Sequence, residues 1–187
     1  MPRSVLFVHQ GYELYGSDRV LLQSIHAVAA QWPHAKITVL LPCEGPLSQL
    51  LRATVHDVRI EDLAVLRKSN LAKMRARDVA GFLRKILAAR KRMKRYDLIY
   101  INTILVMDYI VAASLVRCPR IIHVHEIPTG GAALLFSALL LVSRAFLIFN
   151  SHATRRSFFC PVGSHGPSSG TAFQLRSSQS KPRSTAR

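Results

Sequence analysis

Short apolar runs, each followed by a segment with helical periodicity, limit the fold of this 187-residue chain more than any other feature. The runs lie at residues 4–9, 36–41, 97–101, 120–125 and 145–149, with a weaker one at 55–60. Continuous rather than alternating apolar strands are typical of a parallel sheet covered on both faces. Strands that alternate with helices predict an open, doubly wound parallel α/β sheet, with strand order 3-2-1-4-5-6.

The predicted helices cover residues 17–31, 46–53, 75–95, 104–116, 131–143 and the segment from residue 152. One of them contains an apolar run of 11 residues, 132–142, which Ser143 and Arg144 interrupt. A membrane-spanning helix needs ~20 apolar residues. We therefore expect a buried helix here rather than a membrane span.

The net charge of +16 is concentrated in two segments, because residues 67–95 carry a net +11 and residues 151–187 a net +6. A basic segment favours an acidic partner. The predicted helix 75–95 is basic and amphipathic, so it is either a solvated outer face or a membrane-docking helix. Nucleic acid is not expected as a partner, because no motif of a nucleic-acid-binding module is present. The cations expected to bind a membrane are Arg84, Lys85, Arg90, Lys91, Arg92, Lys94 and Arg95.

The composition changes abruptly near residue 160. Residues 160–187 include 7 Ser, 3 Pro and 3 Gly and no acidic residue, so we expect a domain over 1–159 and a disordered tail over 160–187. This tail is either the result of a truncated or frameshifted reading frame or a natural basic extension. Truncation would leave Phe158 and Phe159 exposed. The three cysteines lack paired spacing, and no signal peptide is visible, which favours a cytoplasmic location.

The loop after the first strand contains the first candidate binding residues, Gly16, Ser17 and Asp18. Gly16 permits a tight turn, and Ser17 is a good N-cap for the following helix. Free N–H groups at a helix start bind phosphate readily. The alternative is a capped helix with no ligand.

Polar side chains follow three other predicted strands. His123 is expected in the core, whereas His125 at the strand end is a candidate for the site, with Glu126 beside it. A metal is not expected, because two histidines supply only two ligands. After the other strands, Asn102, Thr103 and Ser151 either cap the next helix or contact a ligand.

Several blocks together resemble the N-terminal domain of family-four glycosyltransferases, which have the two-lobed GT-B fold. They lie at residues 5–23, 39–51, 96–103, 121–130 and 146–156, and the resemblance covers about residues 4–158. GSDR at 16–19 resembles the family's G-[GSA]-E-R loop, with Asp18 in place of the commoner Glu, and EGPL at 44–47 resembles its G-x-L segment.

The resemblance implies a Rossmann-like lobe of a retaining transferase that moves a sugar from a nucleotide-sugar to an acceptor. The N-terminal lobe would bind a sugar or lipid-linked acceptor, Gly16 and its neighbours would approach the donor diphosphate, and His125 would face the transferred sugar. The basic helix is similar to the membrane-docking helix of some members. The nucleotide-sugar is a substrate, and the resemblance implies no cofactor.

We therefore expect the acceptor-side lobe of a glycosyltransferase for envelope polysaccharide or lipid-linked acceptors, located in the cytoplasm and peripheral on the inner face of the plasma membrane. The family's E-x7-E motif and second lobe are not in the sequence, so the chain alone should be inactive. The alternative is a stand-alone small α/β binding protein with a basic surface that faces a membrane or a nucleic acid. The DNA downstream of codon 160 distinguishes the two.

Overall fold

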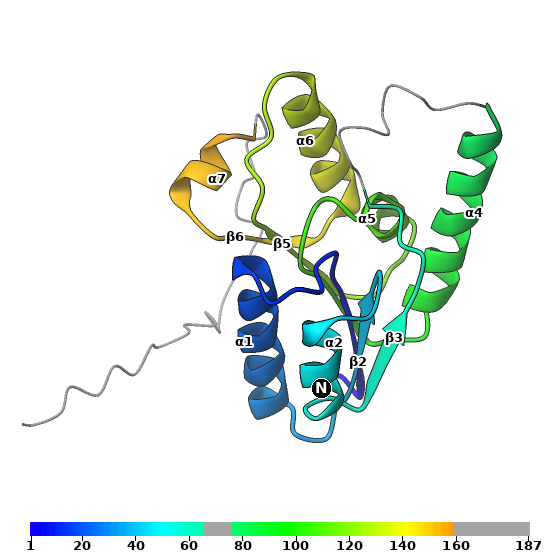
Figure 1. Ribbon diagram of the computed structural model, residues 1–187. Helices are drawn as coiled ribbons and strands as arrows, with labels where there is room; N and C mark the ends of the chain where they lie inside the picture. The colour runs from blue at the N-terminus through cyan, green and yellow to red at the C-terminus, as the bar shows by residue number, and fades with distance from the viewer. Residues whose placement is uncertain (66–75, 159–187) are drawn as a thin grey trace, which may run out of the picture.

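The structure of the protein is a computed structural model that describes residues 1–65 and 76–158 (Figure 1). The expected tail at 160–187 and Phe159 lie outside the described residues. Strands and helices alternate along the chain: β1 Ser4–Val8, α1 Gly16–Gln31, β2 Lys36–Leu41, α2 Pro46–Arg52, β3 Asp57–Ile60, α4 Ala76–Met93, β4 Leu98–Ile101, α5 Met107–Ser114, β5 Arg120–Val124, α6 Gly131–Ser143, β6 Phe146–Phe149 and α7 His152–Arg156.

The strands form one parallel sheet in the order β3-β2-β1-β4-β5-β6, which confirms the predicted fold class and strand order. Strand β1 lies at the centre, where Phe7 pairs with Val39 of β2 and with Tyr100 of β4. The strand order reverses between β1 and β4. In open α/β sheets the ligand crevice lies at such a reversal, beyond the carboxyl ends of the strands.

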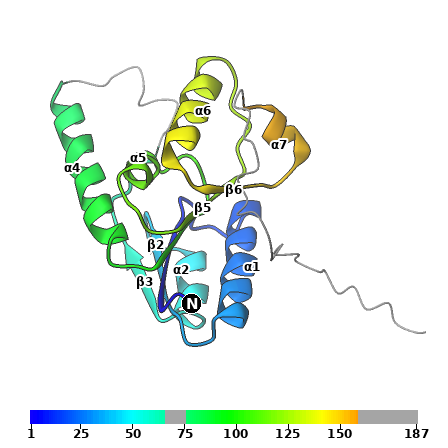
Figure 2. The same ribbon diagram turned by 180° about the vertical axis from the view of Figure 1, so that it is seen from behind.

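Helices cover both faces of the sheet (Figures 1 and 2), and an apolar layer lies between the sheet and the helices on each face. Alternate residues of β1 divide between them, because Val5 and Phe7 pack with α1 and α2, whereas Leu6 and Val8 pack with α4, α5 and α6. Because side chains alternate across a strand, a strand covered on both faces must be apolar at every position. This explains why the central strands read as continuous apolar runs.

The helix predicted over residues 104–116 starts later than the periodicity predicts. Helix α5 begins at Met107 rather than at residue 104. Residue 106 instead forms an antiparallel bridge with Val65, and Met107 N donates to the carbonyl oxygen of Ala64 at 3.0 Å. Pairing with this neighbouring segment keeps the backbone before Met107 out of the helix.

Helix α4 has one broad apolar stripe, of which the core covers only one edge. Ile86 and Met93 are buried in the core and Phe82 packs against it. Residues 79, 83 and 87, at i, i+4 and i+8, form the other edge of the stripe. Their side chains are exposed: Val79 46%, Leu83 54% and Leu87 58%.

Helix α6 is also buried on one face only. Ala133, Phe136 and Leu140 lie in the core, whereas Leu134 and Leu141 are exposed. The expectation of a buried helix is therefore correct for half of its surface. Across residues 1–65 and 76–158, no helix is long and apolar enough to cross a membrane.

Phe158 is buried, which corrects the expectation that it is exposed. Its side chain is 7% exposed, and its ring lies 5.7 Å from that of Phe149, centroid to centroid. Helix α7 ends at Arg156, and the turn after it returns Phe158 to the sheet. The last described residue therefore completes the apolar layer beside β6.

Candidate functional site

A buried His–Asp pair closes the loop between β1 and α1. His9 Nε2 and Asp18 Oδ1 lie 2.6 Å apart, and both side chains are fully or almost fully buried. The other carboxylate oxygen, Oδ2, accepts hydrogen bonds from Leu14 N at 2.8 Å and Tyr15 N at 3.1 Å. Burial alone raises the pKa of Asp18, but the hydrogen bonds from His9 and from these N–H groups outweigh it and hold the pKa below its usual value. Asp18 is therefore a carboxylate at neutral pH.

Gly11 leaves the space that this pair occupies. A Cβ atom at Gly11 would lie 2.1 Å from Asp18 Oδ1 and 2.7 Å from His9 Nε2. Only glycine fits there. Sequence reasoning missed both His9 and Gly11. The one sequence feature that points to these two residues is a loop with two glycines. The spacing of the residues does not show which of the two glycines lies against a side chain.

The start of α1 differs from the prediction. The helix begins at Gly16 and its N-cap is Tyr15, so Ser17 is not the N-cap as predicted. Asp18 takes the capping function, because its carboxylate reaches back to the two residues before the helix. Leu14 adopts φ 71°, a left-handed conformation that non-glycine residues rarely adopt. The Asp18 carboxylate holds that strained backbone in place.

Asn102 connects this loop to the end of β5. Its Nδ2 lies 3.2 Å from His9 Nδ1 and donates to the carbonyl oxygen of Ser17 at 3.0 Å. Its Oδ1 lies 3.1 Å from His125 Nε2. The loop after β1 and the end of β5 are thus two hydrogen bonds apart, and Asn102, fully buried, lies between them.

The two histidines of β5 and its end stack against each other. The ring centroids of His123 and His125 are 4.2 Å apart, and the ring planes are inclined by 30°. Burial lowers the pKa of His123 to about 4, and its Nδ1 lies 2.8 Å from the Tyr100 hydroxyl, as expected for a core histidine. Burial also lowers the pKa of His125, against the opposing effect of Glu126. Both rings are therefore neutral at pH 7, and His125 is the half-exposed one.

Glu126 and Thr103 join neighbouring strand ends. Thr103 Oγ1 donates to Glu126 Oε1, and Glu126 Oε2 accepts from His125 N at 3.1 Å. Thr103 is 1% exposed, so these two residues fix the backbone beneath His125.

The remaining candidates lie closer to solvent. Gly16 is exposed and Ser17 half-exposed at the start of α1, above Asn102. Ser151 is exposed and caps α7, where its Oγ accepts from Thr154 N at 3.0 Å. The structure therefore gathers Gly16, Ser17 and His125 at one sheet edge, and gives Ser151 a capping role.

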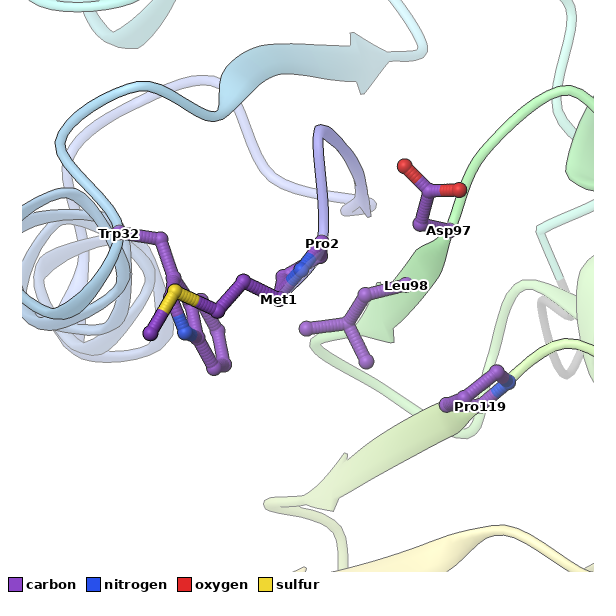
Figure 3. Close-up of a pocket in the computed structure, with 6 residues that line it drawn as sticks. All are labelled: Met1, Pro2, Trp32, Asp97, Leu98 and Pro119. Atoms are coloured by element: carbon purple, nitrogen blue, oxygen red, sulfur yellow. The ribbon is translucent and has the colours of Figure 1, made fainter.

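The described residues contain no group of three or more His, Cys, Asp or Glu side chains that could hold a metal ion. A shallow hollow lies at the opposite edge of the sheet, at the amino ends of the strands (Figure 3). Its lining is mostly apolar, and its one carboxylate, Asp97, accepts hydrogen bonds from the N–H groups of Arg3 and Ser4. The hollow therefore offers little chemistry, and the polar groups of the strand ends make the better candidate site.

The two glycines of the loop give a matched test of this geometry. We expect Gly11→Ala to displace the His9–Asp18 pair and to lower the free energy of unfolding by ~2 kcal/mol or more. Gly16→Ala is the control, because a Cβ there has no atom within 4 Å and alanine suits a helix start. Chemical denaturation measures both. Equal stability of the two variants would contradict the geometry.

Comparisons with known proteins agree on the fold. No protein-family model matches the chain, and no curated protein matches it. Anabaena Alr3699/HepE in complex with UDP and glucose is similar at 20% identity and TM-score 0.57, over 83% of this chain and 40% of that one. The same protein with UDP-glucose is similar at 22% identity and TM-score 0.50, over 83% of this chain and 39% of that one. Acinetobacter baumannii MurG is similar at 18% identity and TM-score 0.51, over 74% of this chain and 39% of that one. The chain therefore spans about 40% of the length of these structures and shares the Rossmann-like fold of that part.

Proposed function

We propose that the chain forms the acceptor-side lobe of a glycosyltransferase, which transfers a sugar from a nucleotide-sugar to an envelope polysaccharide or lipid-linked acceptor. The single observation that carries the proposal is that the start of α1 and His125 meet at the carboxyl edge of the sheet. Asn102 binds the Ser17 carbonyl and lies within 3.1 Å of His125. The similar structures of Anabaena HepE contain UDP, glucose or UDP-glucose, which fits this class of substrate.

The site supports binding and orientation rather than proton transfer. Asp18, Asn102 and Thr103 are buried and bonded within the protein, so they hold the site's shape. The exposed groups at the edge are Gly16, Ser17 and the neutral ring of His125. A transition state that is bound between two lobes is stabilised only when both lobes are present. We therefore propose that this lobe alone is inactive or nearly so.

A chimera tests the proposal. Residues 1–158 would be joined to the part of Anabaena HepE that this chain does not span, and UDP release from UDP-glucose, with water as acceptor, would be measured. We expect His125→Ala to lower kcat by ~10²-fold, or ~2.7 kcal/mol in activation free energy. The variant loses one hydrogen bond, so thermal stability should change little.

His34→Ala is the control for that experiment, because His34 is an exposed histidine outside the site. It should leave both kcat and the melting temperature unchanged. If His125→Ala retains activity and unfolds at a much lower temperature, His125 is a core residue. A chimera that binds UDP through its HepE part and releases none from UDP-glucose would contradict the proposed function.

We also propose that α4 attaches the protein to an anionic membrane surface. The exposed aliphatic row Val79, Leu83 and Leu87 supports this, because the surfaces of globular proteins rarely align large apolar side chains in this way. Four cations on the same helix or just after it are exposed as well: Arg84, Lys91, Lys94 and Arg95. An apolar row flanked by cations is typical of helices that lie in a membrane interface.

The other three predicted cations have partners within the protein. Lys85 Nζ lies 2.7 Å from Asp62 Oδ2, and Arg90 Nε donates to the carbonyl of Leu115 at 3.2 Å. Arg92 points inward, where it contacts Glu61 and donates to Tyr109 Oη at 2.9 Å. Arg92 therefore belongs to the packing of α4, and the proposed membrane surface consists of the four exposed cations and the aliphatic row.

Sedimentation with anionic liposomes at low salt tests this surface. Each Lys or Arg near such a surface is worth ~1 kcal/mol, so replacing Arg84, Lys91, Lys94 and Arg95 by Gln should weaken binding by up to ~10³-fold. Leu83→Ser with Leu87→Ser should weaken it further at high salt, where charge is screened.

The matched control removes four cations elsewhere, by changing Arg19, Arg144, Arg155 and Arg156 to Gln. This variant has the same net charge and should keep most of its binding. Equal losses in the two variants would mean that net charge alone acts. Tighter salt-dependent binding to duplex DNA than to lipid would contradict the membrane proposal.

A further inference from the structure

The buried hydrogen bonds behind His125 determine which nitrogen of each histidine ring carries the proton. The Ser17 carbonyl oxygen can only accept, so the group 3.0 Å from it must be the amide nitrogen of Asn102. The amide oxygen of Asn102 therefore faces His125. An amide has one donor side and one acceptor side, and this single contact orients both.

The orientation of Asn102 determines the proton on His9. The Asn102 nitrogen also donates toward His9 Nδ1 at 3.2 Å, so Nδ1 carries a lone pair. The His9 proton then sits on Nε2 and is donated to the Asp18 carboxylate at 2.6 Å. An ionised carboxylate can only accept hydrogen bonds. Each hydrogen bond between the Ser17 carbonyl and the Asp18 carboxylate therefore joins one donor to one acceptor.

The same orientation determines the proton on His125. Asn102 Oδ1 is only an acceptor, so His125 Nε2 donates to it at 3.1 Å. A neutral ring then carries its lone pair on Nδ1, which makes no hydrogen bond within the described residues. An unprotonated ring nitrogen accepts from a hydroxyl group and cannot donate to a phosphate oxygen.

We propose that Asn102, oriented by the Ser17 carbonyl and by the His9–Asp18 pair, holds His125 in one tautomer, with the proton on Nε2 and an acceptor at Nδ1 for a ligand hydroxyl group. Asp18, His9 and Asn102 are then positioning residues, which act on the ligand through His125. The assignment of the ligand hydroxyl to a sugar rests on the proposed function, whereas the tautomer follows from this chain alone. The Asp18 carboxylate is 2% exposed, in keeping with a role behind the site.

Nitrogen-15 NMR of the histidine side chains in the full chain tests the proposal without any substrate. Ring nitrogen shifts and long-range proton couplings distinguish the two neutral tautomers, and His125→Gln identifies the signals of His125. A free neutral histidine already favours the Nε2-protonated form, so at pH 7.5 we expect the ratio of the two tautomers in the native protein to exceed that of free histidine by about fivefold, as one hydrogen bond implies. Asn102→Leu, which removes both amide groups, should bring the ratio back to that of free histidine.

Asn102→Asp is the matched control, because it keeps an acceptor oxygen for His125 and replaces the donor that faces both His9 and the Ser17 carbonyl. It should preserve the Nε2-protonated form of His125 and shift the His9 signals. If Asn102→Leu does not fold, Asn102→Ala removes the same groups without the bulk and takes its place.

An unchanged single His125 tautomer in Asn102→Leu or Asn102→Ala would overturn the proposal, as would comparable amounts of both tautomers in the native protein. Neither result depends on glycosyl transfer. Failure of the chimera to release UDP, with the tautomer as expected, would overturn the proposed function alone.

Discussion

The buried hydrogen bond between His9 and Asp18 is the interaction on which the candidate site depends. It joins the end of the central strand to the first turn of α1, and both side chains are shielded from water. A buried carboxylate is costly unless hydrogen bonds satisfy it, and here His9 and two backbone N–H groups do so. The loop conformation, including the left-handed Leu14, follows from that requirement.

The fold could be predicted from the sequence because it depends on patterns that are local. Apolar runs such as residues 36–41 and 131–143 give the bounds of β2 and α6 as the structure has them. The alternation of strands and helices then leaves few topologies, of which the observed order is one. The start of α5 differs from the prediction because Val106 pairs with Val65, a residue far away in the sequence.

The site could be predicted only in part. His125 and the start of α1 follow from their places at strand ends, whereas the role of Asp18 depends on His9, nine residues earlier and just after β1. No periodicity relates the two positions. The need for glycine at Gly11 is invisible in the sequence for the same reason, since it reflects the close approach of two side chains. Which edge of the apolar stripe of α4 is buried likewise depends on the neighbours that the helix packs against.

A double-mutant cycle on Asp18→Ala and His125→Ala is the sharpest test of whether the buried groups behave as one unit. The two side chains share no hydrogen bond within the described residues and are connected through Asn102, by way of His9 and of Ser17. Independent sites add to within about 0.5 kcal/mol in unfolding free energy, whereas members of one network do not. A coupling energy clearly above that limit is the predicted result. Additive losses would mean that the hydrogen bonds from Asp18 to His125 are separate, and would contradict a site held by one buried network.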